Sequence, residues 1–302
     1  MRAYVKAVRL ERWPRSLAIF FGSAAFFFFN REALPLFPPL DIAWRLSAAF
    51  LLTWAISTAN YILNEIVDLP FDVHHPTKRF RPLVQGEIKV GPFVLLGVII
   101  TAASMVASYI LFAGAFFISL LALFVAGIVY NVRPMRTKDI PFLDAISESA
   151  NNPIRFLIGW FAFAPPEAFP STALLVSWWS FGNYLMVAKR LSESRFLKDK
   201  AGAYRTSHKK YTTRSLLTGM AASAVICLIS FLYLAFSEKL QTFYVIAPFL
   251  LFLFALILRK TLREEEVMEE PEKMLASPRF ALFTIFLIVL FIVAYFMDAI
   301  GR

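Results

Sequence analysis

The sequence predicts an all-α integral membrane protein, with nine transmembrane helices around a central cavity. Hydrophobic residues make up 59% of the 302 residues and charged residues only 17%, too little polar surface to cover a soluble fold of this size. The apolar runs are close to the ~20 residues that cross a hydrocarbon core as a helix. Runs such as 250–258 lack the alternating polarity of a membrane β-strand, so the helical class is favoured.

The nine expected spans follow one another with no soluble domain between them. They are residues 16–30, 41–63, 92–111, 113–130, 143–164, 172–188, 216–237, 242–258 and 280–299. We therefore expect a single transmembrane domain over residues 1–302.

Positive charge predicts the orientation of these spans. With the N-terminus inside, the cytoplasmic segments are 1–15, 64–91, 131–142, 189–215 and 259–279, and they hold most of the 31 Lys and Arg residues. Lys and Arg concentrate on the cytoplasmic side of membrane proteins, so we expect a cell-membrane protein with its N-terminus and polar loops in the cytoplasm. Orientation and attraction to anionic lipids account for the net charge of +10, and no nucleic acid is expected as a partner.

A stripe of polar residues lies at the end of the second span. Asn60, Asn64, Asp68 and Asp72 are spaced four residues apart, which places their side chains on one face of a helix. Mg²⁺ prefers oxygen ligands and usually binds through one or two carboxylates together with substrate phosphates. The expected metal ligands are therefore Asn64, Asp68 and Asp72, with Mg²⁺ as the cofactor.

Three cations follow the stripe and complete a site for a diphosphate. Lys78, Arg79 and Arg81 supply the charge that phosphate oxygens require. Glu65 lies about 100° off the face of the stripe and is expected to be a helper or a solvated residue. The alternative is that these acids and bases only neutralise one another at the membrane edge.

A second polar group lies around the fifth span. Asp144, Glu148, Asn151 and Arg155 form a stripe with steps of four, three and four inside a stretch long enough to span. Ionisable groups in the bilayer usually face the protein interior and pair with one another. The stripe is expected to line the floor of the cavity, below Tyr130, Arg136 and Lys138 at the phosphate level. A purely structural pair of Glu148 and Arg155 is the alternative.

A third polar group begins where the sixth span ends. Lys189 and Arg190 lie close enough to the membrane to be site candidates, whereas the later lysines of 189–215 fit an ordinary cytoplasmic surface. The loops 64–91 and 189–215 occupy corresponding places four helices apart. This spacing indicates an internal duplication in which two loops close over one site.

The motif N-x-x-x-D-x-x-x-D at Asn64, Asp68 and Asp72, followed by a basic Arg-Pro segment, resembles the UbiA superfamily of intramembrane prenyltransferases. The resemblance covers nearly the whole chain. It implies a UbiA-like bundle in which Mg²⁺, bound by two Asp-containing motifs, holds a polyprenyl diphosphate whose tail lies in a cavity open to membrane lipids. It also implies that the first motif acts with nearby phosphate contacts, namely Lys78, Arg79, Arg81, Tyr130 and Lys138.

Two departures from the family pattern bear on the substrate. Many members with aromatic acceptors carry a second D-x-x-x-D motif after the sixth helix, where this chain has Lys189 and Arg190. The more usual Asn-Asp pair of the first motif is Asn64-Glu65 here. The variant, with HPTKRFRP and AYRTSHKKY, is similar to the branch that moves phosphoribosyl from phosphoribosyl diphosphate to decaprenyl phosphate.

The expected activity is Mg²⁺-dependent transfer of a prenyl group from a polyprenyl diphosphate, with release of diphosphate. The alternative is phosphoribosyl transfer from phosphoribosyl diphosphate to a polyprenyl phosphate, and a cation-coupled transporter is the third reading. The residues expected to act in catalysis are Asp68, Asp72 and Lys138. Those expected to bind substrate are Lys78, Arg79, Arg81, Tyr130, Asp144, Arg155, Lys189 and Arg190.

Overall fold

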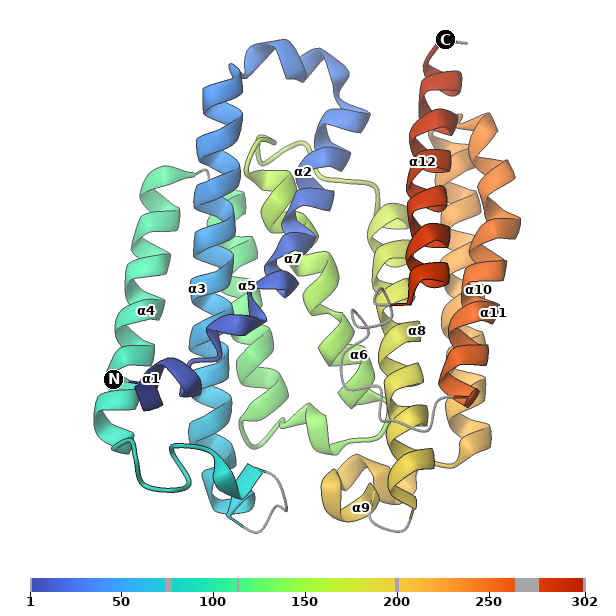
Figure 1. The fold of residues 1–302 in the computed structure, drawn as a ribbon. Helices are drawn as coiled ribbons and strands as arrows, with labels where there is room; N and C mark the ends of the chain where they lie inside the picture. Colours follow the sequence, from blue (N-terminus) through green and yellow to red (C-terminus); the bar gives the residue numbers. More distant parts are fainter. Residues whose placement is uncertain (1, 74–77, 113, 199–200, 264–276, 301–302) are drawn as a thin grey trace. The chain divides into compact units, whose positions relative to one another are not determined.

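The computed structural model describes residues 2–73, 78–112, 114–198, 201–263 and 277–300, and within these ranges the chain forms helices and no strands (Figure 1). It divides into two compact units. Unit 1 consists of Met1–Thr137 and Asn151–Pro170, and unit 2 of Lys138–Ala150 and Ser171–Arg302. The all-α class is confirmed.

Unit 1 is built around one long helix. Its elements are α1 (Arg2–Ala7), η1 (Leu10–Leu17), α2 (Ala18–Phe29), η2 (Arg31–Leu36), α3 (Pro39–Asp72), η3 (Lys78–Phe80), α4 (Val90–Leu111), α5 (Gly114–Asn131) and α7 (Asn151–Phe161). Helix α3 packs against α4, α5, α7, α2 and η1. It begins with Pro39 at its first position, where proline needs no hydrogen-bond partner, and runs through the whole polar stripe.

Glycines allow α2 and α7 to pack with their backbones in contact. A Cβ on Gly22 would lie 1.9 Å from the carbonyl oxygen of Phe156, and one on Gly159 would lie 1.9 Å from that of Ile19. The Ser23 hydroxyl donates to the Gly159 carbonyl over 2.8 Å. Small residues and interhelical hydrogen bonds are the usual means by which membrane helices associate.

Unit 2 is a second helical bundle. It contains α6 (Leu143–Ser149), α8 (Thr172–Leu197), α9 (Ala201–Tyr204), η6 (Thr206–Lys210), α10 (Thr213–Ser237), η7 (Gln241–Ile246), α11 (Ala247–Arg263) and α12 (Pro278–Ile300), and η4 (Thr137–Asp139) lies at the boundary. Helix α8 packs against α10, α11 and α6. The Asn183 amide donates to the Ser223 hydroxyl over 2.9 Å, and the Tyr184 hydroxyl donates to the Phe254 carbonyl over 2.6 Å.

Among the described residues, six helical segments are long and apolar enough to cross a membrane. They are Pro39–Asp72, Val90–Leu111, Gly114–Asn131, Thr213–Ser237, Gln241–Arg263 and Pro278–Asp298, and they correspond to six of the nine expected spans. The count of nine is not confirmed. In the first expected span, 16–30, the α-helix α2 has only 12 residues, because η1 continues to Leu17. Helix α8 has 26 residues but is not among the six.

The expected span 143–164 is wrong as a single helix. Helix α6 ends at Ser149 and α7 begins at Asn151, so the stripe of Asp144, Glu148, Asn151 and Arg155 is split between the two units. The break has a physical cause in Pro153, which has no N–H to donate to the carbonyl four residues earlier, at Ser149. Asp144 and Glu148 therefore belong to α6, whereas Asn151 and Arg155 belong to α7.

Candidate active site

The acidic face of α3 consists of three buried carboxylates. Glu65, Asp68 and Asp72 have exposures of 2%, 7% and 3%. Their spacing of three and four residues places them on one side of the helix. Glu65, expected as a helper or a solvated residue, is thus a full member of the buried face.

Arg81 holds two of these carboxylates at once. Its Nη1 forms an ion pair with Asp72 Oδ2 and lies 3.4 Å from Glu65 Oε1. Lys78 Nζ lies 3.9 Å from the other oxygen of Asp72. Glu65 Oε1 also accepts a hydrogen bond of 2.5 Å from Arg9 Nη2. The basic segment after α3 and the N-terminal segment therefore meet at the acidic face.

The third carboxylate, Asp68, is held from the segment that follows α5. Arg136 Nη2 donates to Asp68 Oδ1 over 3.0 Å, and its Nη1 donates to the Asn131 carbonyl over 3.2 Å. The guanidinium also lies 4.6 Å from the ring centre of Phe71. These three contacts fix the side chain of Arg136. Its backbone has a positive φ of 32°.

The other expected residues of unit 1 have more varied surroundings. Asn64 and Tyr130 are half-buried, whereas Arg79 is exposed and lies over the Phe80 ring, 4.8 Å from its centre. Arg155 of α7 donates to the Ser57 hydroxyl of α3 over 3.4 Å. This bond joins Arg155 to the same helix that carries the acidic face, about two to four turns before its carboxylates.

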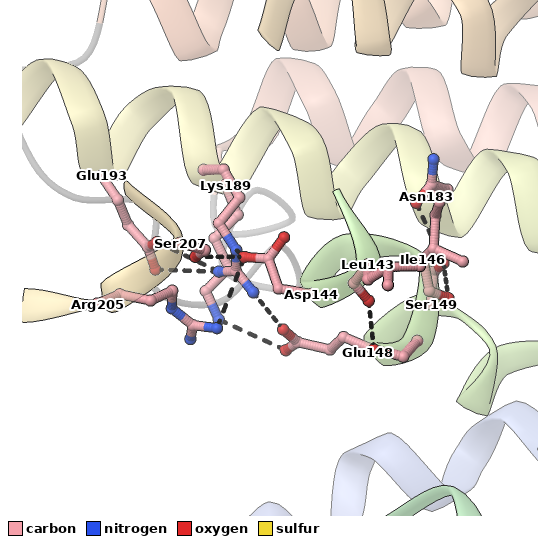
Figure 2. A network of polar contacts seen from close by, with 12 residues as sticks. Leu143, Asp144, Ile146, Glu148, Ser149, Asn183, Lys189, Glu193, Arg205 and Ser207 are labelled. Carbon is pink, nitrogen blue, oxygen red and sulfur yellow. Dashed lines mark hydrogen bonds and ion pairs between the residues drawn. The ribbon is translucent and has the colours of Figure 1, made fainter. Parts of the chain in front are cut away.

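Unit 2 contains a second network, centred on Arg190 of α8. Figure 2 labels the carboxylates of this network, Asp144, Glu148 and Glu193. Arg190 is completely buried. Its Nε donates to Asp144 Oδ2 over 2.7 Å, its Nη2 to Glu148 Oε2 over 2.5 Å, and its Nη1 contacts both oxygens of Glu193 at 3.2 and 3.3 Å. All branches of the guanidinium are therefore occupied by carboxylates of its own unit.

Asp144 is the second centre of this network. It accepts hydrogen bonds from the Ser207 hydroxyl over 2.9 Å and from the Tyr211 hydroxyl, which in turn accepts from the Phe142 N–H over 2.7 Å. Burial, followed by the charge of Asp144, raises the pKa of Tyr211 above its ordinary value. Tyr211 therefore remains a neutral donor and joins α6 to the segment before α10.

Glu193 is held on two sides. Its Oε2 lies 2.8 Å from Nε2 of the buried His208. Burial alone would raise the pKa of Glu193, but the charge of Arg190 and the bond to His208 outweigh burial and hold this pKa well below its usual range. Glu193 is therefore ionised.

Lys138, Lys189 and Arg205 are three further cations of unit 2. Lys138 is buried on η4, with an exposure of 8%. Lys189 Nζ lies 3.7 Å from Glu148 Oε1, and Arg205 Nη1 lies 3.8 Å from Asp144 Oδ2. The segment 189–215, the third polar group of the sequence, thus contacts Asp144 and Glu148, which belong to the second polar group.

The donor set of α3 fits a hard divalent cation. Among the residues that the structure describes, no group of three or more His, Cys, Asp or Glu side chains is arranged to hold a metal. Mg²⁺ does not require one, because it commonly binds through one or two carboxylates, with phosphates and water as the remaining ligands. Asp68 and Asp72, one turn apart and both buried, with the Asn64 amide one turn earlier, meet that requirement.

Several site residues escaped the reasoning from sequence. Arg9 lies 56 positions before its partner Glu65, and no local pattern predicts so distant a pair. Glu193, Ser207 and Tyr211 belong to the segment 189–215. The many cations of this segment do not indicate which of its other side chains form hydrogen bonds. The i, i+3 spacing of Arg190 and Glu193 was the one available signal.

The fold and this site define an integral multi-pass membrane protein with a buried acidic face that cations hold in place. The model of the UbiA prenyltransferase family matches residues 18–280. The chain therefore belongs to the UbiA prenyltransferase family, a family of transferases, as the resemblance predicted.

Individual relatives are more distant. The chain is 28% identical over 227 residues to a decaprenyl-phosphate phosphoribosyltransferase of Mycolicibacterium smegmatis, covering 74% of this chain and 68% of the relative. It is 26% identical over 231 residues to the enzyme of that name from Corynebacterium glutamicum, covering 74% and 64%. A solved UbiA homologue from Archaeoglobus fulgidus, bound to GPP and Mg²⁺, matches with a TM-score of 0.68 and 19% identity over 97% of this chain and 99% of that one.

Proposed function

We propose that the protein is a Mg²⁺-dependent phosphoribosyltransferase that moves phosphoribosyl from phosphoribosyl diphosphate to a polyprenyl phosphate. In this reaction the bond from the anomeric carbon to diphosphate breaks, and a bond from that carbon to an acceptor phosphate oxygen forms. Prenyl transfer, the first expectation from the sequence, becomes the second candidate. The similarity to two decaprenyl-phosphate phosphoribosyltransferases motivates the change in order.

The observation that carries the proposal is the complete burial of Arg190 among three carboxylates. In family members with a second acidic motif, this region supplies carboxylates for metal binding. Here a guanidinium already neutralises Asp144, Glu148 and Glu193. Unit 2 is therefore better suited to bind an anionic group through its remaining cations than to bind a second Mg²⁺.

In unit 1, Asp68 and Asp72, with Asn64, would hold Mg²⁺. When bound, the metal supplies positive charge to the departing diphosphate. Arg81, Arg136 and Lys78 already lie against these carboxylates at hydrogen-bonding or ion-pair distance. They can therefore neutralise diphosphate without a large movement, and such prearranged charge is commonly the largest catalytic contribution.

In unit 2, Lys189 is the cation that we assign to the phosphate of the polyprenyl acceptor. Its ammonium makes one ion pair, at 3.7 Å, with a half-buried carboxylate. Arg190, expected from the sequence to contact the same phosphate, is instead assigned a positioning role, because its donors already face Asp144, Glu148 and Glu193. Lys138 stays a proposed phosphate contact on the strength of the family resemblance.

Prenyl transfer is kept as the second candidate because the solved homologue holds GPP and Mg²⁺. The acidic face of α3 with its cations suits either diphosphate. A cation-coupled transporter is not proposed, because the chain belongs to a family of transferases.

A transfer assay separates the two candidates. Purified protein in detergent is supplied with Mg²⁺, decaprenyl phosphate and phosphoribosyl diphosphate labelled in the ribose, and label in the lipid extract is measured. The proposal predicts Mg²⁺-dependent label in the lipid and release of one diphosphate per label transferred. Transfer from labelled geranylgeranyl diphosphate to an added acceptor, with no ribose transfer, would instead establish the second candidate.

A further inference from the structure

The segment before α2 places three arginines on one side. Arg9 precedes η1, and Arg12 and Arg15 follow at intervals of three residues. A 3₁₀-helix has three residues per turn, so these side chains lie on the same face. The Arg12 N–H donates to the Arg9 carbonyl over 3.0 Å, which closes the first turn.

This arginine face is directed at α3. Arg9 donates to Glu65, and its guanidinium lies 6.0 Å from the ring centre of Tyr61. Arg15 Nη1 donates to the Tyr61 hydroxyl over 3.2 Å. Tyr61 and Glu65 are one turn apart, so η1 and Arg9 contact α3 on the turn just before Asp68.

The opposite side of η1 is apolar and exposed. Leu10, Trp13 and Leu17 are 37%, 46% and 38% exposed, whereas Arg9, Arg12 and Arg15 are only partly exposed. A basic segment that served only for orientation or surface charge would direct its arginines outward. In this one, Arg9 and Arg15 contact α3, while Leu10 and Leu17 are exposed and Trp13 makes an edge contact with the Phe50 ring of α3.

The arrangement carries an electrostatic cost that an anion would relieve. Burial lowers the pKa of Arg12, and the charges of Arg15 and Arg9 lower it further. Tyr61 and Glu11 act in the opposite direction and raise this pKa. The buried carboxylate next to the arginine face is Glu65, and it is shared with Arg81. Arginine forks match phosphate oxygens in geometry as well as in charge.

We propose that the face formed by Arg9, Arg12 and Arg15 binds a phosphate group. Its source is the sugar phosphate of the donor, which remains on the ribose when diphosphate leaves, and this assignment of the source rests on the proposed function. The face is continuous with the proposed metal-binding stripe, because Glu65 Oε1 forms ion pairs with both Arg9 and Arg81. A prenyl diphosphate carries no phosphate besides its leaving diphosphate, so this face distinguishes the two donors.

The test uses purified full-length protein in neutral detergent, with ribose 5-phosphate as the probe. The variants are Arg12→Gln, Arg12→Lys and, as a matched control, Lys6→Gln, which alters an exposed cation of α1 in the same segment. Ribose 5-phosphate should raise the melting temperature of the wild type and of Lys6→Gln, but not of Arg12→Gln, with partial recovery in Arg12→Lys. Melting without ligand shows whether each variant is folded.

Kinetics gives a second readout that a structural role would not produce. In Arg12→Gln the KM for phosphoribosyl diphosphate should rise roughly 10- to 100-fold, since hydrogen bonds to charged groups contribute at that level. The KM for decaprenyl phosphate and kcat should change less than about threefold. Equal stabilisation by ribose 5-phosphate and equal KM values in wild type and Arg12→Gln would overturn the proposal.

A lipid headgroup is the other source of phosphate, and a separate arm tests it. The same variants are placed in nanodiscs of phosphatidylcholine with and without phosphatidylglycerol. If phosphatidylglycerol stabilises the wild type but not Arg12→Gln, while ribose 5-phosphate has no effect on either, the donor assignment is overturned in favour of a lipid site. If the wild type fails to turn over phosphoribosyl diphosphate at all, the proposed function fails, and the two stabilisation arms still decide whether the arginine face binds phosphate.

Discussion

Arg136 and Asp68 join the end of α5 to the acidic face of α3. Their 3.0 Å contact lies within unit 1, and both residues are almost completely buried. A carboxylate and a guanidinium removed from water stabilise one another only while both remain in place. The pair therefore fixes Asp68 in the position at which we expect it to bind Mg²⁺.

Neutralising the acidic face should remove activity. Asp68→Asn and Asp72→Asn each delete one carboxylate charge of the proposed metal site, and we expect turnover to fall roughly 100-fold or more. Asp41→Asn, on the first turn of the same helix, is the control and should retain near-normal activity. The transfer assay, with melting curves for all three proteins, checks this expectation. Near-normal turnover in both stripe variants would remove the metal-site assignment.

The sequence was sufficient to predict this face, because a spacing of four residues on a helix depends only on local geometry. The motif on this helix also predicted the family correctly. It failed at 143–164, where uniform hydrophobicity concealed the break that Pro153 introduces. Hydropathy reports how apolar a segment is, but not whether its backbone hydrogen bonds continue.

The sequence alone did not predict the ion pairs that depend on tertiary structure. The spacing places Glu65 about 100° off the stripe of Asn60, Asn64, Asp68 and Asp72. Glu65 is nevertheless buried, because Arg9 and Arg81, which come from other segments, pair with it. Likewise the sequence predicts that Arg190 is close to the membrane edge, but not that three carboxylates enclose it.

Removing the centre of the unit 2 network should destabilise the protein. Arg190→Met leaves Asp144, Glu148 and Glu193 without their shared cation, and loss of one partner from a buried ion pair costs about 3–5 kcal/mol. Arg214→Met, at an exposed position on α10, is the control and should change little. Unfolding in detergent by heat or denaturant provides the measurement. An Arg190→Met protein as stable as Arg214→Met would contradict the structural role given to Arg190.

Acid should weaken unit 2 through Glu193. Its pKa is lower in the folded protein than in the unfolded chain, so its contribution to stability is present above the unfolded pKa of about 4.3 and is lost as pH falls below it. Between about pH 5 and 3 the wild type should lose stability more steeply than Glu193→Gln, by up to about 1.4 kcal/mol per pH unit. The exposed Glu87→Gln serves as the control and should follow the wild type. Parallel curves for wild type and Glu193→Gln would refute the ion-pair account.

The contact of α2 with α7 should depend on its glycines. Alanine at Gly22 or Gly159 would place a Cβ against a backbone carbonyl, which forces the helices apart, and overpacking of this kind typically costs about 1–3 kcal/mol. Gly91→Ala, where a Cβ meets nothing within 4 Å, should be neutral or slightly stabilising. The melting temperatures of the three alanine variants test this prediction. Equal melting temperatures in Gly22→Ala, Gly159→Ala and Gly91→Ala would show that α2 and α7 do not pack this closely.

The central claim is that the donor is phosphoribosyl diphosphate bound with Mg²⁺. The most direct measurement is the melting temperature of the purified protein with phosphoribosyl diphosphate or geranylgeranyl diphosphate, each with Mg²⁺ and with EDTA, because a ligand that binds only the folded state raises its stability. We predict stabilisation by the sugar diphosphate that requires Mg²⁺ and is lost in Asp72→Asn. Mg²⁺-dependent stabilisation by geranylgeranyl diphosphate alone would contradict the claim and establish prenyl transfer in its place.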